Sequence, residues 1–320
     1  MLQILLITFP FFALVLAGYL AARRGMLPLE AIPGLNGFVL FFALPCMLFR
    51  FGSTAPIAQL LDGAVAAVYL FCGLLLVALT VAVSLNARIR WNDAAFGALV
   101  AAFPNSGFMG VPLIVALLGP SAAGTVILTM LLDMVVISSL CIALSRLDEG
   151  HGQGRAAMLG AARKALRGVL LNPMPWAIGL GGLASAYAFH LPGPIQQTVW
   201  LLADAASPVA LFTIGAVLAR AQMRSEHPMP LADYLPVSLI KLLLHPLLVL
   251  GVGWLAMRAG LPLSPAALTV MVLTAALPSA SNVSLLAERY GADNGRIARI
   301  ILVTTAASFL SFSAAVAWLR

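Results

Sequence analysis

Long runs of apolar residues recur along the whole chain of 320 residues. A helix rises about 1.5 Å per residue, so a run of about 20 residues can cross a hydrocarbon core of about 30 Å. Ten such runs cover residues 2–22, 34–51, 62–86, 93–118, 121–146, 170–190, 196–219, 234–258, 265–290 and 294–318. Only 9% of the residues are charged, whereas soluble domains carry roughly a quarter. The sequence therefore predicts an all-α membrane protein with ten transmembrane helices.

The basic residues predict how these helices are oriented, because cytoplasmic loops are enriched in Lys and Arg. Fourteen of the 18 basic residues lie in or beside the loops after odd-numbered spans: Arg23, Arg24, Arg88, Arg90, Arg146, Arg155, Arg163, Lys164, Arg167, Arg220, Arg224, Arg289, Arg296 and Arg299. The opposite side has Arg50, Arg258 and Arg320. We therefore expect a multi-pass protein of the inner (plasma) membrane with both termini outside. The net charge of +7 reflects this loop pattern and does not indicate a nucleic-acid partner.

The two halves of the chain resemble each other. Residues recur in the same order at offsets of 164, 163 and 174: Gly18 with Gly182, Pro28 with Pro192, Pro45 and Phe49 with Pro208 and Phe212, and Pro104 with Pro278. These matches favour a first five-helix repeat at 1–146, a cytoplasmic linker at 147–169 and a second five-helix repeat at 170–320. Because five spans is an odd number, the second repeat is inverted relative to the first, as in many secondary transporters.

The fourth and ninth spans are interrupted by polar segments. The first interruption contains Pro104, Asn105 and Ser106, and the second contains Pro278, Ser279, Ser281 and Asn282. A helix break in lipid leaves backbone groups unpaired, so it usually faces protein or a watery cavity. One such break is more often an ordinary kink. Two breaks at matched positions of an inverted repeat predict crossover helices 4 and 9, whose free N–H groups, amides and hydroxyls bind an anion.

Two charged side chains and a histidine within spans are further candidates for a role in transport. Asp133 lies in the fifth span, and Lys241 and His245 lie one turn apart in the eighth. A buried charge needs a partner or a watery cavity. Lys241 either supplies fixed positive charge in place of a coupling cation or extends to the cytoplasmic surface. Asp133 is either a proton carrier or the ion-pair partner of Lys241, and His245 either titrates or bonds a neighbouring helix.

The sequence offers no support for catalysis or for a bound cofactor. The motifs G-x-S-x-G, H-E-x-x-H and Walker A are absent, so we expect a protein that is not an enzyme. Cys46, Cys72 and Cys141 lie in apolar segments without C-x-x-C spacing, which predicts buried thiols rather than a disulfide or a metal site. The N-terminal run lacks a basic region and a clear cleavage site, so we expect a retained helix.

Several segments resemble the auxin efflux carrier family, which includes plant PIN-type carriers and bacterial malonate carriers. The segments are FPNSGFMGVPL, ALPSASNVSLLAERYG, KLLLHPLL and LLNPMPWAIGLGG. The resemblance implies two inverted repeats related to the sodium/bile-acid symporter fold, with a scaffold of spans 1, 2, 6 and 7 and a mobile unit of spans 3–5 and 8–10. A homodimer through the scaffold helices is compatible with it. It also implies that Asn105 and Asn282 meet the substrate carboxylate, with Pro104 and Pro278 shaping the breaks.

Together these features predict a secondary transporter of a small organic anion that works by an elevator-type movement in the lipid bilayer. One alternative is a sodium-coupled symporter of the bile-acid type, in which carbonyl groups and Asp133 hold sodium. Another is a receptor that binds the anion without moving it. The short linker departs from the long cytoplasmic loop of the plant carriers, and neither the substrate nor the direction of transport follows from the sequence.

Overall fold

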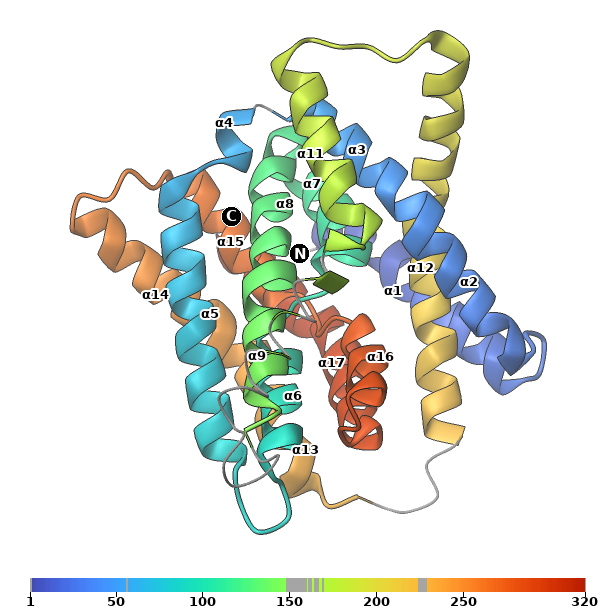
Figure 1. Ribbon diagram of the computed structural model, residues 1–320, viewed down its shortest axis with the longest axis vertical. Helices are drawn as coiled ribbons and strands as arrows, with labels where there is room; N and C mark the ends of the chain where they lie inside the picture. The colour runs from blue at the N-terminus through green and yellow to red at the C-terminus, as the bar shows by residue number, and fades with distance from the viewer. Residues whose placement is uncertain are drawn as a thin grey trace.

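The computed structural model describes residues 2–55, 57–147, 160, 163, 167–168, 170–223 and 229–319, and the regular structure within these residues is helical (Figure 1). The α-helices are α1 (Leu2–Arg23), α2 (Ile32–Phe38), α3 (Leu44–Thr54), α4 (Ile57–Leu60), α5 (Gly63–Ser84), α6 (Trp91–Ala102), α7 (Val111–Leu118), α8 (Ala123–Leu132), α9 (Ser138–Leu144), α11 (Pro173–Ala186), α12 (Gly193–Met223), α13 (Leu231–Leu239), α14 (His245–Arg258), α15 (Pro265–Ala276), α16 (Asn282–Arg289) and α17 (Asn294–Leu319). Four π-helical segments adjoin these helices in the described part of the chain. They are η2 (Val39–Ala43) between α2 and α3, η3 (Ser106–Gly110) before α7, η5 (Asp133–Ile137) between α8 and α9, and η6 (Ile240–Leu244) between α13 and α14.

Seven continuous helical stretches of the described residues are long and apolar enough to cross a membrane. They are Ile4–Arg23, Leu29–Thr54, Ala58–Ser84, Pro120–Leu144, Gly193–Met223, Leu231–Arg258 and Asn294–Leu319. The protein is therefore a multi-pass membrane protein. The other three predicted spans correspond to shorter helices, namely α6 with α7, α11, and α15 with α16. The total of ten spans accordingly stays a prediction, and most of the predicted linker at 147–169 lies outside the described residues.

Polar residues at the ends of the apolar runs begin several helices. The Asp62 carboxylate accepts hydrogen bonds from the N–H groups of Ala64 and Val65 and so caps α5. Asn172 and Ser264 cap α11 and α15 in the same way, and each is followed by a proline in the first turn. Such caps satisfy N–H groups that have no partner inside the helix. Asp62 is therefore a helix cap at the start of α5.

Four helices, α1, α3, α11 and α12, pack closely on one side of the molecule, and we call them the seam group (Figure 1). α1 packs along α12, and α3 packs along both α11 and α12. Glycines make this close approach possible. A Cβ atom at Gly18 in α1 would overlap the Phe212 carbonyl of α12, and one at Gly215 in α12 would overlap the Val15 carbonyl of α1. Small residues let membrane helices approach backbone to backbone.

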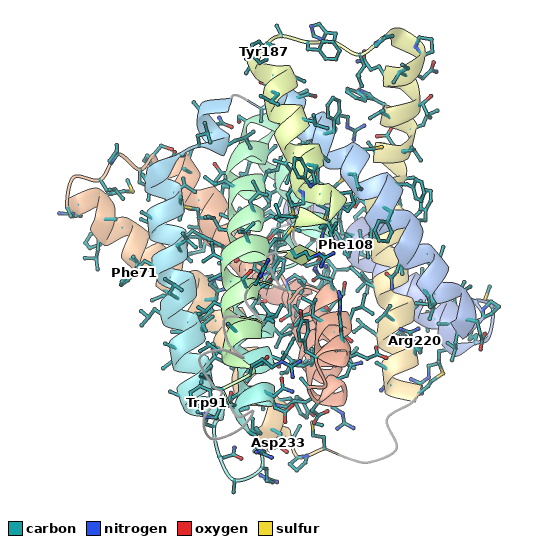
Figure 2. The ribbon with its side chains drawn as sticks, viewed as in Figure 1. Phe71, Trp91, Phe108, Tyr187, Arg220 and Asp233 are labelled. Atoms are coloured by element: carbon teal, nitrogen blue, oxygen red, sulfur yellow. The ribbon has the colours of Figure 1, made fainter. Side chains whose placement is uncertain are left out.

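The remaining long helices form a second group, made of α5–α9 and α13–α17, which we call the crossover group. α5 packs against α6 and α14, and α15 packs against α8, α14 and α17. The outer surface of this group is apolar: Figure 2 shows Phe71 of α5 pointing outward, whereas Phe108 of η3 lies in the interior. Exposed apolar side chains of this kind face lipid in a membrane protein.

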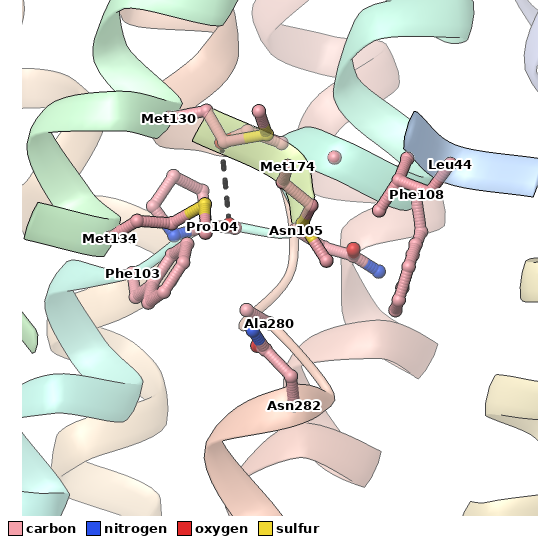
Figure 3. Close-up of a pocket in the computed structure, with 12 residues that line it drawn as sticks. Leu44, Phe103, Pro104, Asn105, Phe108, Met130, Met134, Met174, Ala280 and Asn282 are labelled. Carbon is pink, nitrogen blue, oxygen red and sulfur yellow. Dashed lines mark hydrogen bonds between the residues drawn. The ribbon is translucent and has the colours of Figure 1, made fainter. Parts of the chain in front are cut away.

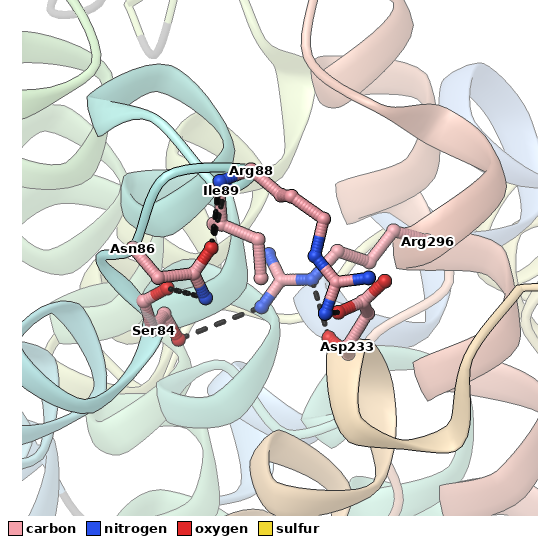
Figure 4. Close-up of polar contacts among 6 residues, drawn as sticks. All are labelled: Ser84, Asn86, Arg88, Ile89, Asp233 and Arg296. Carbon is pink, nitrogen blue, oxygen red and sulfur yellow. Dashed lines mark hydrogen bonds and ion pairs between the residues drawn. The ribbon is translucent and has the colours of Figure 1, made fainter.

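A buried arginine joins one end of the crossover group. Arg296 at the start of α17 is 2% exposed. Its guanidinium donates hydrogen bonds to the backbone oxygens of Asp233, at 2.6 Å, and of Asp93, at 2.8 Å. It also lies 3.5 Å from the Ser84 hydroxyl, and Arg88 forms an ion pair with the Asp233 side chain at 3.3 Å (Figure 4). One side chain therefore holds the ends of α5, α6, α13 and α17 together.

Candidate functional site

The two predicted helix breaks are present, and they contact each other directly. α6 ends at Ala102 and the chain becomes helical again at Ser106, while α15 ends at Ala276 and α16 begins at Asn282. The N–H group of Asn105 donates to the Pro278 oxygen at 2.8 Å, and the N–H group of Ala280 donates to the Phe103 oxygen at 2.9 Å. These two bonds pair the breaks as an antiparallel bridge between Pro104 and Ser279.

The backbone groups at the breaks are used differently from the expectation. The sequence predicts free N–H groups that point into a gap. Instead, the N–H groups of Asn105 and Ala280 bond the opposite break, and the N–H group of Ser279 lies 3.3 Å from the Thr304 hydroxyl. A backbone N–H or C=O group that is buried in lipid without a hydrogen-bond partner destabilises the fold by several kcal/mol. The opposite break therefore satisfies two of these amides and Thr304 of α17 satisfies the third. Side chains carry most of the remaining polar chemistry.

Those side chains are buried and partly without hydrogen-bond partners. Asn105 is 5% exposed and Ser106 is fully buried, with its hydroxyl 3.3 Å from the Pro104 oxygen. Among the described residues, the Oδ1 atom of Asn282 and the Oγ atom of Ser279 are buried and have no hydrogen-bond partner. Buried polar atoms without partners are uncommon in folded proteins and call for an explanation, such as a ligand or a water molecule.

A small cavity lies where the breaks cross. Pro104, Asn105, Ser106 and Asn282 line it, and Figure 3 shows Asn105 and Asn282 entering it from the two different breaks. Its volume is about 20 Å³, which suffices for roughly one water molecule. The opposite wall is apolar and flexible, because it contains Met130, Met134 and Met174 beside Leu44, Phe103 and Phe108. In this conformation the space beside Asn105 is therefore smaller than an organic anion.

A larger cavity adjoins the small one and shares Phe103, Met134, Met174 and Asn282 with it. Its volume is about 280 Å³, and it extends along α16 to Arg289. Ser138 and Ser139 of α9 line its wall, and the Ser139 hydroxyl is buried without a hydrogen-bond partner among the described residues. Ser281 lies elsewhere, since it lines a separate narrow crevice with Asn36 and Asn282. Asn282 is thus the predicted residue that all three of these cavities share, whereas Pro278 and Ser279 line none of the three.

Asp133, Lys241 and His245 lie together in a different place, beside α15. Lys241 is fully buried, and its Nζ atom donates to the Ala275 oxygen at 3.1 Å and lies 3.1 Å from Nδ1 of His245. Asp133 is 1% exposed, and its Oδ2 atom accepts a hydrogen bond from the Tyr69 hydroxyl at 2.9 Å. Because Lys241 is fully buried and bonded inside, it does not extend to the surface, and that alternative from the sequence is wrong.

One of the two roles that the sequence leaves open for Asp133, a direct ion pair with Lys241, does not occur among the described residues. In the described part of the chain, their charged atoms are not within ion-pair distance, and each has a different hydrogen-bond partner. Tyr69 donates to Asp133, and its ring centroid is 6.3 Å from that of His245, which lies beside Lys241. Sequence reasoning missed both Tyr69 and Thr304, because a tyrosine or a threonine within an apolar span carries no signal of which helix it faces.

Comparisons with known proteins identify the family of this chain. The family model described as "Membrane transport protein" matches residues 4–316. The chain belongs to this family. It is the auxin efflux carrier family that the sequence motifs resemble, so that prediction is confirmed. The family match makes the protein a membrane transporter, and a transporter is not an enzyme.

Individual relatives of the family are similar over most of their length. A "Putative malonate transporter" of Rhizobium meliloti (strain 1021) is 31% identical over 298 residues, which cover 92% of this chain and 89% of the relative. An "Uncharacterized transporter" of Methanothermobacter thermautotrophicus is 28% identical over 302 residues, with 93% and 92% coverage. The "Uncharacterized transporter YfdV" of Escherichia coli (strain K12) is 25% identical over 292 residues, with 88% and 86% coverage.

Proposed function

We propose that this protein is a secondary transporter of a small organic anion and that the anion's carboxylate binds at the crossing of the two breaks. The observation that carries this proposal is that Asn105 and Asn282, from separate breaks, line one cavity. An asparagine amide can donate two hydrogen bonds to a carboxylate without placing a permanent charge in the membrane. The relative named as a malonate transporter supports a carboxylate ligand.

The site residues have distinct roles in this proposal. Asn105 and Asn282 donate to the carboxylate, and Ser106 supplies a hydroxyl group in the same cavity. Ser279 and Ser281 flank Ala280, which lines that cavity. Pro104 and Pro278 keep the helices broken, because neither can donate a backbone hydrogen bond. Since the space at Asn105 is only about 20 Å³, binding requires the methionine side chains of the opposite wall to move. The cavity of about 280 Å³ is the route by which the anion reaches Asn282.

The movement we propose is of the elevator type, with ten spans in two inverted repeats. The contacts of the seam group support this plan. If α1 corresponds to α11 and α3 to α12, the pair α1–α12 and the pair α11–α3 are equivalent under the repeat, and both pairs are closely packed. The seam group is then the scaffold, and the crossover group is the unit that moves. Both termini lie outside the plasma membrane in this plan, and a homodimer would form through the scaffold.

Uptake of labelled malonate by proteoliposomes tests the proposal. We expect Asn105→Ala and Asn282→Ala each to lower uptake at least tenfold, because each loses amide donors that the apolar wall cannot replace. Gln197→Ala is the matched control, since it removes an exposed amide at the start of α12, and its uptake should equal that of the wild type. Equal uptake by all four proteins would contradict the proposed site.

The same preparation separates the two alternatives. A sodium-coupled symporter of the bile-acid type would take up malonate only when sodium is present outside the vesicles. A receptor would bind malonate, raising the melting temperature by mass action, and yet move none across the vesicle membrane. Secondary transport of the anion without sodium predicts that malonate raises the melting temperature and also crosses the vesicle membrane.

A further inference from the structure

The last turn of α16 carries two opposite charges that face different cavities. Arg289 lines the cavity of about 280 Å³ that reaches Asn282, whereas Glu288 lines a separate cavity of about 210 Å³ beside α12. Successive residues of a helix point about 100° apart, so the two side chains leave α16 in different directions. α16 lies between α9 and α12, and one cavity adjoins each of these helices (Figure 1). The cavity that leads to the helix breaks therefore has a positive residue at its end, and the neighbouring negative residue faces the other cavity.

Arg289 is the one charged side chain among the described residues that line the larger cavity. It has no ion-pair partner in the described part of the chain. A second arginine adds positive charge at the same end, because the Arg146 guanidinium lies 5.3 Å from the ring centroid of Tyr290, which also lines the cavity. A cleft lined by one sign of charge attracts ions of the opposite sign. An anion that enters by this route therefore meets positive charge before it reaches Asn282.

Other polar side chains of this cavity can donate hydrogen bonds to an anion. The Ser139 hydroxyl is buried and has no hydrogen-bond partner among the described residues. The Oδ1 atom of Asn172 accepts from the Met174 N–H group at 3.0 Å, so the NH2 group of this amide remains as a donor. The described residues that line the cavity include no carboxylate. The cavity therefore combines hydrogen-bond donors with a positive charge, which is the chemistry that binds a carboxylate.

The spacing of Asn282 and Arg289 suits a small ligand with two ends. Asn282 is the first residue of α16 and Arg289 is the last, seven residues later. Seven residues correspond to about two turns and a rise of about 10 Å, so both residues lie on one face of the helix. Side chains leave a helix tilted toward its amino end, so the Arg289 side chain starts in the direction of Asn282. The long arginine side chain shortens the remaining gap to the length of a small molecule.

These observations assign a role in substrate selection to Arg289. We propose that Arg289 selects anions with a second acidic group: one carboxylate lies at the helix breaks, and the guanidinium binds the second carboxylate in the larger cavity. A guanidinium can bind a carboxylate through two parallel hydrogen bonds and carries a permanent charge. The inference rests on the proposed function and adds the substrate class, a small dicarboxylate, together with the residue that selects it.

A simpler role for Arg289 makes a different prediction. A basic residue in the last turn of a helix is stabilising because the helix dipole is negative there, and Arg289 ends α16. A residue with this role alone would treat anions with one and with two carboxylates alike. Selection of a dicarboxylate instead predicts that the loss of the guanidinium changes the preference between them.

The first test compares dicarboxylates with their monoamides on the wild-type protein. Malonate, succinate and glutarate are paired with malonamate, succinamate and glutaramate, which have nearly the same shape and one negative charge fewer. Titration calorimetry of the purified full chain in detergent measures the dissociation constant of each compound. We expect the dicarboxylate of at least one pair to bind at least tenfold more tightly than its monoamide. Equal binding within every pair, or binding of none of the three dicarboxylates, would overturn the inference.

The second test removes the guanidinium. Arg289 is exposed, so Arg289→Gln should fold; it should bind the dicarboxylate at least tenfold more weakly and the monoamide within about twofold of the wild type. Arg289→Lys should keep an intermediate preference, because an ammonium supplies the charge without the paired hydrogen bonds. Two controls should keep the wild-type preference: Arg24→Gln, at an exposed arginine just after α1, and Glu288→Gln, in the other cavity. A wild-type preference in Arg289→Gln, or an equal loss for both compounds, would overturn the inference.

The two proposals fail in different ways. Asn105→Ala and Asn282→Ala should weaken binding of both members of a pair, because each compound has the carboxylate that lies at the breaks. If these variants bind both compounds as the wild type does, the carboxylate site is wrong. If they lose both compounds while Arg289→Gln keeps the wild-type preference, the carboxylate site stands and selection by Arg289 alone is wrong.

Discussion

The helices of the seam group and those of the crossover group pack against each other through different kinds of contact. In the seam group, glycines bring backbones together: a Cβ at Gly181 of α11 would lie 2.7 Å from the Phe49 oxygen of α3. In the crossover group, side chains bond to backbone oxygens of other helices, as Lys241 and Arg296 do. The seam group is therefore held mainly by close backbone contacts, with an ion pair between Arg50 of α3 and Asp204 of α12 where the Asp204 side chain is 67% exposed. The crossover group instead contains buried charged side chains and most of the buried polar atoms that have no hydrogen-bond partner among the described residues. The first suits a rigid support and the second suits a ligand site.

The largest effect on stability should come from the seam group. Gly215→Val would place side-chain atoms on the Val15 carbonyl, so α1 and α12 would have to separate. We expect a loss of more than about 3 kcal/mol, or no folded protein, because overpacking against backbone cannot relax by a change of rotamer. The melting temperature in detergent measures it. Gly251→Val is the matched control, since a Cβ there meets nothing within 4 Å. If Gly215→Val melted at the same temperature as Gly251→Val, α1 and α12 of the seam group could separate without a loss of stability.

Removal of the buried arginine should have the next largest effect. Arg296→Met leaves the Asp233 and Asp93 oxygens without their donor at the end of the crossover group. Each hydrogen bond to a charged group contributes roughly 1.5–3 kcal/mol, and the apolar methionine side chain recovers a part of this by packing. We therefore expect a net loss of about 2–3 kcal/mol, measured as a lower melting temperature. Arg258→Met, at an exposed helix end, should change it little. A result equal to that control would mean that the helix ends are held by packing alone.

The two groups also differ in how far the sequence predicts them. The breaks were predictable because proline, asparagine and serine stand out in an apolar run, and Pro104 and Pro278 recur at matched positions. The seam glycines were harder to recognise. Gly18 was noticed as part of a repeat, but glycine is common in membrane helices, and nothing local identifies Phe212 as its partner. A contact between distant helices depends on their orientation, which the sequence does not contain.

The same limit of sequence-based prediction applies to the buried polar side chains beside α15. Lys241, Asp133 and His245 were predicted as a set because buried charge is costly, and they do lie together with Tyr69. Of the two roles left open for Asp133, the ion pair with Lys241 is wrong. Lys241 bonds the Ala275 oxygen rather than Asp133, because the break at Pro278 strands that oxygen nearby. Opposite charges in a sequence suggest an ion pair. The sequence does not show that a carbonyl oxygen, left without its helical partner by the break, lies near the same ammonium and accepts its hydrogen bond.

A smaller effect should follow from removing the acceptor for the stranded amide. Thr304→Val keeps the shape of the side chain but leaves the Ser279 N–H group without its partner at 3.3 Å. Leaving a buried donor unsatisfied costs about 1–3 kcal/mol, and we expect the lower half of this range because that bond is long. Thr269→Val is the matched control, since its hydroxyl bonds the carbonyl four residues earlier on an exposed face. Equal melting temperatures for the two variants would mean that Ser279 finds another acceptor.

The smallest effect on stability should come from Ser106, at the first break. Ser106→Ala removes a hydroxyl that is 3.3 Å from the Pro104 oxygen, and the backbone N–H of Ser106 still donates to that oxygen at 2.7 Å. The loss should therefore be about 0.5 kcal/mol, at the low end for a neutral hydrogen bond. Ser308→Ala, which removes a buried hydroxyl bonded to the Thr305 oxygen within α17, is the control. Malonate uptake separates the two variants: if the crossing binds a carboxylate, Ser106→Ala lowers uptake severalfold at nearly unchanged stability, whereas Ser308→Ala does not. Equal uptake would remove Ser106 from the site and leave it a helix-end residue.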